Sequence, residues 1–378
     1  MERPYQICTN CVMDTTDSKI TFDEHGVCDH CRTFKKDIKP YWHPDEESAR
    51  KLQEIVDNIK KNGKGKKYDC MIGMSGGLDS SYLAYIAIAK YGLRPLVYNI
   101  DTGWGEPFAD ENIRKITSKL GVELVVEKLD WPTMREAQLA YFRAAVPHID
   151  TPQDHASFAT IYHFASKYGI RNILTGTNYS TECIRNPMEW MYYQSDEWQV
   201  KDIFKHFYHG SYDKFPMTNI LWHKFYLPYI KRIKVFDFLN YIPYERKKAM
   251  AELEKEFGYQ NYSQKHFENI FTKFYESYWL YEKFGYDTRR VQLSSLILTG
   301  QMTRDEALEI LKKPPYDPNT IEQDFNRIAE KLGITPDELR GFMKLPNKTY
   351  KDYKNQQTLY IIGAKVLHTL GIVRGGKR

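Results

Sequence analysis

From residue 66 to residue 176 the sequence alternates between short apolar runs and longer, helix-periodic stretches. The runs YDCMIGM, RPLVYNID, VELVVEKLD and RNILTG are separated by stretches such as SYLAYIAIAKYG and ADENIRKITSKLG. When a helix follows each strand, the chain crosses back over the sheet and the next strand runs parallel to the last. We therefore predict an α/β fold built on a doubly wound parallel sheet, with ligand-binding loops at the carboxyl ends of its strands.

One of these strand ends carries the hexapeptide SGGLDS, which begins at Ser75. Gly76 and Gly77 permit backbone angles at which several N–H groups converge on one anion, and the helix that follows adds its N-terminus. Ser75 and Ser80 can donate hydroxyl hydrogen bonds to a phosphate, whereas Asp79 would repel it unless a cation such as Mg²⁺ lies between them. The loop matches neither the Walker A pattern nor GxGxxG. A glycine-bearing turn with Asp79 or Ser80 as N-cap is the alternative without a ligand.

Two more strand ends carry polar side chains. The run that ends at Asp101 is followed by TGW, and the run that ends at Gly176 is followed by TNYSTE. The carboxyl ends of parallel strands meet at one edge of a sheet, so we expect these segments and SGGLDS to face one ligand site. The alternative in each case is a polar cap for the turn or helix that follows.

Four of the six cysteines form two close pairs near the start of the chain, Cys8 with Cys11 and Cys28 with Cys31. This spacing is typical of a zinc ribbon or knuckle, because two thiolate pairs on tight turns can close a tetrahedral S₄ site. We predict one structural Zn²⁺ on these four residues, since a metal with four thiolate ligands has no open position for catalysis. Two disulfides or an iron–sulfur cluster are the alternatives.

The composition argues against several classes of protein. The chain of 378 residues is 42% hydrophobic and 27% charged, which is typical of a soluble globular protein. Its net charge of +5 suits anionic ligands such as nucleotides, but no dense Lys/Arg stripe accompanies it, so nucleic acid is not expected as a partner. No run reaches the length of a membrane-spanning helix, and MERPYQICTN lacks a signal-peptide core. We therefore expect a cytoplasmic protein without a membrane partner.

Changes of pattern along the chain indicate three units. A charged, helix-periodic stretch ends in the linker KNGKGKK before the first strand, and beyond residue 240 the strand pattern gives way to helices. Two capping boxes mark helix starts there, Thr303 with Glu306 and Thr335 with Glu338. We predict a zinc-binding module and the start of a linker at 1–45, the sheet domain at 46–240 and a helical C-terminal domain at 241–378.

The SGGLDS loop resembles the SGGxDS loop of the N-type ATP pyrophosphatases, the PP-loop superfamily that includes GMP, NAD and asparagine synthetases. The resemblance implies ATP and Mg²⁺ as cofactors, cleavage of ATP between its α- and β-phosphates, and transfer of AMP to an oxygen atom. It also implies that three loops bind ATP, through Ser75, Gly76, Gly77, Asp79 and Ser80 in the first, Asp101 in the second, and Gly176, Thr177, Asn178 and Glu182 in the third.

The same resemblance suggests roles for charged residues. GTNYSTE is similar to a turn of NAD synthetase that supplies a second metal carboxylate, so Asp79 and Glu182 are the expected Mg²⁺ ligands. The segment LPYIKRIKVFDFL resembles the superfamily's segment that delivers a lysine to the pyrophosphate. By spacing the candidate is Lys234, with Lys231 as the neighbouring alternative, and a solvated lysine on an amphipathic helix is the other interpretation. Ser75, Asp79 and Lys234 are thus the expected catalytic residues.

Nearly the whole chain resembles the bacterial N-acetyl sugar amidotransferase family. CxxCVMDTT…GVCDHC, SGGLDS and the long stretch that begins KHFENIFTKFYESYWL occur in the family's order. The resemblance implies conversion of an acetamido group on a free or nucleotide-linked sugar into an acetamidino group, in lipopolysaccharide O-antigen or pseudaminic acid biosynthesis. Four residues of the last stretch are expected to contact the sugar, with the two arginines as a clamp for a diphosphate or carboxylate: His266, Glu268, Arg289 and Arg290.

Ammonia is expected from separate partners like the glutaminase and cyclase subunits of histidine biosynthesis, because neither Cys70 nor Cys183 lies in a glutaminase nucleophile turn. Two other functions stay open. A tRNA-thiolation enzyme of the same superfamily would need a catalytic cysteine, for which Cys183 is the candidate. A zinc-ribbon adaptor without enzymatic activity would leave SGGLDS unexplained.

Overall fold

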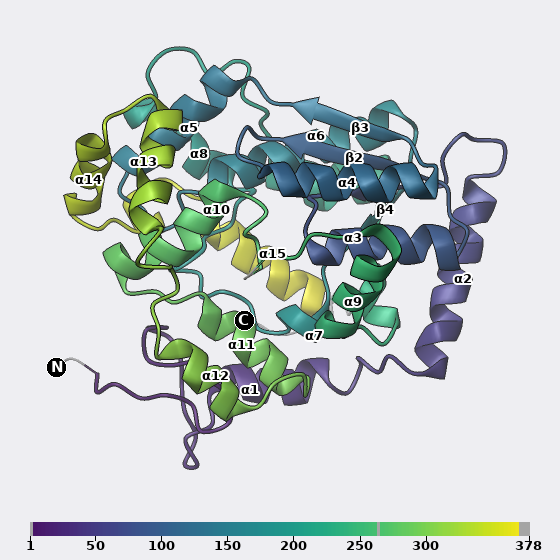
Figure 1. Ribbon diagram of the computed structural model, residues 1–378, viewed down its shortest axis with the longest axis horizontal. Helices are drawn as coiled ribbons and strands as arrows, with labels where there is room; N and C mark the ends of the chain where they lie inside the picture. Colours follow the sequence, from purple (N-terminus) through teal and green to yellow (C-terminus); the bar gives the residue numbers. More distant parts are fainter. Residues whose placement is uncertain (1–2, 263–264, 370–378) are drawn as a thin grey trace.

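The computed structural model describes residues 3–262 and 265–369 (Figure 1). It contains a five-stranded parallel sheet with the strand order β3-β2-β1-β4-β5. The strands are β1 (Cys70–Gly73), β2 (Pro95–Asp101), β3 (Leu124–Lys128), β4 (Asn172–Thr175) and β5 (Lys234–Asp237). The predicted parallel α/β sheet is confirmed.

Helices connect and flank the strands. As far as α6 they are α1 (Asp29–Thr33), η1 (Phe34–Ile38), α2 (Glu46–Asn62), α3 (Leu78–Tyr85), its extension η2 (Ile86–Lys90), α4 (Pro107–Leu120), α5 (Trp131–Arg143) and α6 (Thr151–Lys167). After β4 they are α7 (Tyr179–Glu182), α8 (Glu197–Phe207), η3 (Trp222–Ile230), η4 (Phe238–Tyr241), α9 (Arg246–Phe257), α10 (Ile270–Phe274), η5 (Tyr275–Lys283), α11 (Arg289–Leu298), α12 (Arg304–Leu311), α13 (Ile321–Leu332), α14 (Pro336–Lys344), η6 (Tyr350–Asp352) and α15 (Gln357–Thr369).

The order of the strands creates a switch point beside β1. The chain moves outward from β1 through β2 to β3 and then returns to the other side of β1 as β4 and β5. The loops that leave β1 and β4 therefore diverge, and a crevice opens between them at the carboxyl ends of these strands. Ile72 is in register with Leu174, so SGGLDS and GTNYSTE begin at nearly the same level. The topology thus brings two of the predicted loops together.

Both faces of the sheet are buried, which explains why its inner strands are apolar runs without strict alternation. On one face Ile72 and Leu174 pack with residues of α2, α3, α4 and α9. On the other face Met71 and Leu96 pack with residues of α6 and η3. Figure 1 shows α3 and α4 side by side on the face of the sheet nearest the viewer. The loop between β1 and α3 is therefore held by packing at both of its ends.

The segment LPYIKRIKVFDFL forms a strand that the sequence did not predict. An amphipathic helix was the alternative interpretation of this segment, but η3 ends at Ile230 and β5 begins at Lys234. Between them Arg232 has a φ of +55°, a left-handed conformation that a helix cannot continue through. β5 is an edge strand with mostly exposed residues, so it lacks the apolar pattern that identified the four inner strands.

The helical C-terminal region packs on the sheet domain through a buried aromatic cluster. The ring of Phe271 lies 5.0 Å from Trp104 and 5.8 Å from Phe142, and Phe142 lies 5.0 Å from Trp279. Both predicted capping boxes are present, at the starts of α12 and α14.

Within the described residues, no helix has the length and apolar character needed to cross a membrane.

Because Phe271 joins the two regions and is fully buried, its replacement by alanine should destabilise the protein by about 3–5 kcal/mol through lost apolar contact and a residual cavity. Urea unfolding would measure the change. Phe158→Ala is the matched control, since 41% of Phe158 is exposed and its loss should cost far less. Equal destabilisation by the two variants would contradict this description of the core.

Candidate active site

A cavity of about 200 Å³ lies where the loops after β1 and β4 meet. The SGGLDS loop and GTNYSTE line one part of it, and the segments around Arg246 and residues 265–268 line the rest, together with two side chains of α11. Nine sequence-predicted residues are among the lining residues, namely Ser75, Gly77, Asp79, Ser80, Gly176, Thr177, Glu182, His266 and Glu268. The cavity therefore sits at the ligand position expected for a doubly wound sheet.

The glycines of these loops are required by close packing. Gly76 has a φ of +82°, and a Cβ atom there would lie 2.5 Å from the carbonyl oxygen of Ala109. A Cβ on Gly77 would lie 2.4 Å from the Glu268 carboxylate, and one on Gly176 would lie 3.0 Å from the backbone of Asp79. α3 begins directly after Gly77, so its N-terminus opens at the cavity. Glycine backbone and helix N-terminus together form a cradle that suits an anion.

The two serines of the loop are linked to each other and to the far wall. The backbone N–H of Ser75 donates to Oγ of Ser80 at 3.2 Å, and the N–H of Gly77 donates to Oγ of Ser75 at 3.2 Å. The Ser75 hydroxyl also donates to Oε1 of Glu268 at 3.2 Å. Leu78 N–H donates to the hydroxyl of Tyr262 at 2.9 Å. The loop is thus held in an ordered conformation with its hydroxyls beside the cavity.

A lysine joins the two loops. Nζ of Lys265 lies 2.7 Å from Oδ2 of Asp79 and 2.5 Å from Oε1 of Glu182. Burial alone would raise the pKa of Asp79, but the charge and hydrogen bond of Lys265 outweigh it and hold the pKa below its ordinary value. The Tyr244 hydroxyl donates to Oδ1 of the same carboxylate. Two ionised carboxylates from different strand ends thus converge on one cation, which is a donor set that fits Mg²⁺.

Lys265 was not identified from the sequence, and Lys234 was identified wrongly. Lys234 is the first residue of β5 and pairs with Asn172, the first residue of β4, so it lies at the amino ends of the strands, away from the loops. Lys231 does not line the cavity either; its ammonium lies over the Tyr226 ring. The candidate was chosen by its spacing within LPYIKRIKVFDFL, and spacing alone does not show at which end of the sheet a residue of β5 lies.

Two predicted nucleotide residues have local partners instead of lining the cavity. Oδ1 of Asp101 accepts a hydrogen bond from the N–H of Gly103 at 2.8 Å, as in the turn-capping alternative. Asn178 is the N-cap of α7 and accepts from the N–H of Thr181 at 2.8 Å. Asn178 therefore shapes the turn that presents Glu182, and Asp101 stabilises the turn after β2.

The structure separates the four residues expected to contact the sugar. His266 and Glu268 line the cavity. Arg289 and Arg290 do not, which contradicts the predicted clamp. Arg289 is buried, pairs with Asp287 at 2.7 Å and donates to backbone carbonyls beyond α12. Arg290 pairs with Asp14 at 3.0 Å and donates to the carbonyl of Val12. Both arginines hold α11 in place because their charges are already matched.

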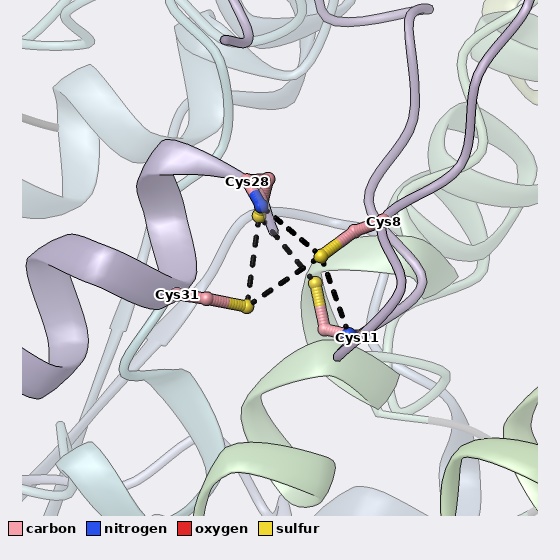
Figure 2. Close-up of side chains that lie close together, drawn as sticks. All are labelled: Cys8, Cys11, Cys28 and Cys31. Carbon is pink, nitrogen blue, oxygen red and sulfur yellow. Dashed lines mark hydrogen bonds between the residues drawn. The ribbon is translucent and has the colours of Figure 1, made fainter. Parts of the chain in front are cut away.

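The four N-terminal cysteines come together in one cluster (Figure 2). Their sulfur atoms all lie within 4.8 Å of one another, and neighbouring sulfurs are 3.6 to 3.8 Å apart. Four sulfurs at 2.3 Å from a central metal would stand about 3.8 Å apart in a tetrahedron. Oxidised pairs are not present, since all four residues are free cysteines. The predicted cluster is confirmed as a site with the shape of a tetrahedral metal centre.

Backbone N–H groups donate hydrogen bonds to two sulfur atoms of this cluster. Sγ of Cys8 accepts from the N–H groups of Asn10, Cys11 and Cys28 at 3.2 to 3.4 Å. Sγ of Cys11 accepts from the N–H of Met13 at 3.4 Å. N–H groups aimed at sulfur stabilise its negative charge, as second-shell donors do in metal sites.

The other two cysteines are remote from this chemistry. Cys70 is fully buried in β1, and burial raises the pKa of its thiol. Cys183 is 6% exposed, and burial raises the pKa of its thiol to about 12. Neither residue lines the cavity. Thiols that stay protonated near neutral pH are poor nucleophiles.

Comparison with known proteins identifies the C-terminal region. Residues 268–367 match the family described as LPS biosynthesis protein WbpG-like, C-terminal domain. This part of the chain is therefore similar to the WbpG-like C-terminal domain, which agrees with the family relationship expected from the sequence. Glu268 and the two α11 residues at the cavity, Gln292 and Leu296, belong to the WbpG-like domain, so this domain forms one wall of the site.

Other similarities extend beyond the WbpG-like domain. An uncharacterized protein from Methanocaldococcus jannaschii is 26% identical over 174 residues, which are 45% of this chain and 58% of that protein. An NMN synthetase from Francisella tularensis matches 81% of this chain and 98% of its own, with 15% identity and a TM-score of 0.30. An NH3-dependent NAD synthetase from Campylobacter jejuni matches 79% and 98%, with 14% identity and a TM-score of 0.28.

Removing one thiol should abolish stoichiometric metal binding. Cys11→Ser leaves three thiolates, so the purified variant should lose most of its metal and unfold at a lower temperature. Elemental analysis of metal-replete protein would identify the metal and its amount. Cys70→Ser is the control and should keep the wild-type metal content. Wild-type protein without any bound metal would refute the assignment.

The lysine at the cavity should be essential, and the lysine on β5 should not be. Lys265→Met removes the cation between Asp79 and Glu182 and should lower ATP-dependent release of pyrophosphate about 10²- to 10³-fold. Lys234→Met should leave the rate within about twofold, because Lys234 lies at the opposite edge of the sheet. A coupled phosphatase assay for pyrophosphate would measure both rates. The reverse order of the two variants would refute this placement.

Proposed function

We propose that this chain is an ATP-dependent amidotransferase, the synthetase subunit that converts the acetamido group of an N-acetyl sugar or sugar nucleotide into an acetamidino group. ATP is cleaved to AMP and pyrophosphate, and ammonia supplies the nitrogen. The observation that carries this proposal is the meeting of SGGLDS, Glu182 and Lys265 at one cavity walled by a WbpG-like domain. The pathway would be that of a bacterial surface polysaccharide or nonulosonic acid.

The proposed reaction does not require a nucleophilic side chain. An amide oxygen is a poor leaving group, and transfer of AMP to it creates an imidate from which AMP departs readily. The substrate oxygen attacks the α-phosphate of ATP, so the protein must position the reactants and stabilise charge. The glycine cradle and the Ser75 and Ser80 hydroxyls would hold the phosphates, and Lys265 and Arg246 would offset their charge.

Asp79 and Glu182 would hold Mg²⁺, which supplies charge compensation to the phosphates when bound. Their carboxylates already lie around one cation, and Tyr244 fixes the orientation of Asp79. Asp79 is kept ionised by Lys265, which lowers its pKa against the effect of burial. A carboxylate that stays charged across the physiological range is the form that a divalent cation needs.

Glu268 is the best candidate for orienting the acetamido group. Its Oε1 accepts from the Ser75 hydroxyl, and its Oε2 is buried without a hydrogen-bond partner among the described residues. A buried carboxylate oxygen without a donor is costly, so it favours a ligand that brings one. The N–H of an acetamido group is such a donor. His266, which also lines the cavity, would lie on the sugar side.

Ammonia would come from separate glutaminase and cyclase-like subunits, in the cytoplasm where ATP is available. Cys70 and Cys183 are both buried, and burial raises the pKa of each thiol. This supports the proposal that the chain does not hydrolyse glutamine itself. The same observation disfavours the tRNA-thiolation alternative, which needs a reactive thiol. An adaptor without enzymatic activity would give no reason for the ordered loop at the cavity.

Incubation with ATP, Mg²⁺, ammonium and a panel of free and UDP-linked N-acetyl sugars should convert one sugar into a product lighter by about one mass unit, as oxygen is replaced by NH. Mass spectrometry would detect the product, and AMP should appear in equal amount. Asp79→Asn is the inactive control, while Cys183→Ser should retain full activity. Glutamine in place of ammonium should give no product. AMP formation without a lighter sugar across the panel would contradict the proposal.

A further inference from the structure

A second group of charged residues lies behind the cavity, on the far side of His266. It contains three carboxylates: Asp150 and Asp154 at the start of α6, and Glu276 in η5. Asp150 and Glu276 are buried, and Asp154 is half-buried. Nδ1 of His266 donates to Oε1 of Glu276 at 2.9 Å, so the group is continuous with the cavity wall. None of these carboxylates has a role in the adenylation described above.

Most of the hydrogen-bond partners of these carboxylates are neutral. The Thr272 hydroxyl donates to Oδ2 of Asp150 at 2.9 Å, and the Gln153 amide donates to its other oxygen. Oδ2 of Asp154 accepts from the Gln194 amide at 3.0 Å. The cation in contact with the group is His266, on Glu276. Three acids against one base leave an excess of negative charge in a poorly solvated place, which is costly unless a further cation enters.

Burial and the neighbouring charges shift the pKa values of this group. Burial, then the charge of Asp154, raises the pKa of Asp150 to about 8. Burial raises the pKa of Asp154 to about 6. Burial works against the charged form of His266, but the Glu276 carboxylate outweighs it and raises the pKa of His266 to about 9. Near neutral pH Asp150 is therefore mostly protonated, whereas Asp154 is mostly ionised and is the carboxylate that can accept a proton from a bound donor.

An unpartnered hydroxyl shows where a ligand would lie. Tyr275 is 1% exposed, and within the described part of the chain its hydroxyl has no hydrogen-bond partner. Burial raises the pKa of Tyr275, and the charges that raise it further are those of Asp150, Glu276 and Asp154. A buried phenol hydroxyl without a partner is costly, so it favours a small ligand that can hydrogen-bond to it.

We propose that Asp150, Asp154, Glu276 and the Tyr275 hydroxyl bind ammonium, and that a carboxylate of this group takes its proton and releases ammonia beside the adenylation cavity. This inference rests on the proposed function, which requires ammonia. In the described residues the three carboxylates are not compact enough to count as a metal cluster. An N–H donor reaches its acceptor at about 2.8 Å, compared with about 2.1 Å for Mg²⁺, so ammonium spans a wider set of oxygens.

The proton and electrons balance without another reactant. Ammonium gives one proton to a carboxylate, which becomes a carboxylic acid, and the nitrogen regains its lone pair. That pair forms a C–N bond to the adenylylated acetamido carbon while the C–O bond to AMP breaks, and AMP leaves with the electron pair. The product carries the remaining protons as an acetamidinium group, and the carboxylic acid returns its proton to water. A base held near the attacking atom raises the effective amount of free ammonia.

Asp154→Asn and Tyr275→Phe test the site in the full-length chain. Each should raise the KM for ammonium about tenfold and leave the KM for ATP within about twofold. The Tyr275 hydroxyl makes no hydrogen bond, so Tyr275→Phe should not lower the unfolding temperature, which separates a binding role from a structural one. Asp305→Asn is the matched control, because Asp305 is an exposed residue in the first turn of α12. An unchanged KM for ammonium in both variants would overturn the inference.

A binding measurement tests the ammonium site independently of the amidotransferase reaction. Ammonium chloride should raise the unfolding temperature of the wild-type protein more than sodium chloride at equal ionic strength, and Asp154→Asn should abolish this difference while Asp305→Asn keeps it. That result would support the site even if no sugar on the panel reacts. No ammonium-specific shift in the wild type, or the same shift in Asp154→Asn, would overturn it even if the amidotransferase reaction is found.

Discussion

The site depends on how closely two backbones approach at the switch point of the sheet. Gly176 at the end of β4 leaves no room for a side chain, because the backbone of Asp79 lies 3.0 Å from the position of its Cβ. A Cβ on Gly76 would lie even closer to backbone atoms, 2.5 Å from the carbonyl oxygen of Ala109 in α4. These contacts fix the direction in which α3 leaves the sheet and bring Asp79 toward Glu182, far away in the sequence. The cradle, the paired carboxylates and the cavity all follow from this approach.

Local patterns were sufficient for the inner strands, the SGGLDS loop and the cysteine cluster, because strand, glycine turn and helix signals depend on neighbouring residues. Local patterns failed where contacts between distant segments determine the position of a side chain. Lys265 reaches Asp79 from 186 positions away and has no periodic signal of its own. Lys234 was misplaced because the left-handed turn at Arg232 and the pairing of an edge strand are tertiary effects. Arg289 looked available for a ligand because its pairing with Asp287 depends on the folded turn before α11.

One helix, α11, contacts both the N-terminal cysteine module and the cavity. On its outer side α11 is held to the N-terminal module by the ion pair of Arg290 with Asp14. On its inner side the same helix contributes Gln292 and Leu296 to the cavity. Folding of the cysteine module therefore bears on the shape of the site without any contact between the metal ligands and the substrate. A metal bound to the four cysteines would therefore do more than compensate for the small core of the first residues.

If the proposed Mg²⁺ and ATP bind at this cavity, Lys265 would also influence which form of the metal ion the site accepts. Its ammonium is a counter-ion tethered to the protein, and a tethered group competes at millimolar or higher effective concentration. A bare divalent ion would have to displace it from Asp79 and Glu182 and leave a buried lysine without a partner. Phosphates that arrive together with the metal would give Lys265 new anions in exchange. The lysine bridge would thus favour binding of the metal–nucleotide complex over binding of the bare metal ion.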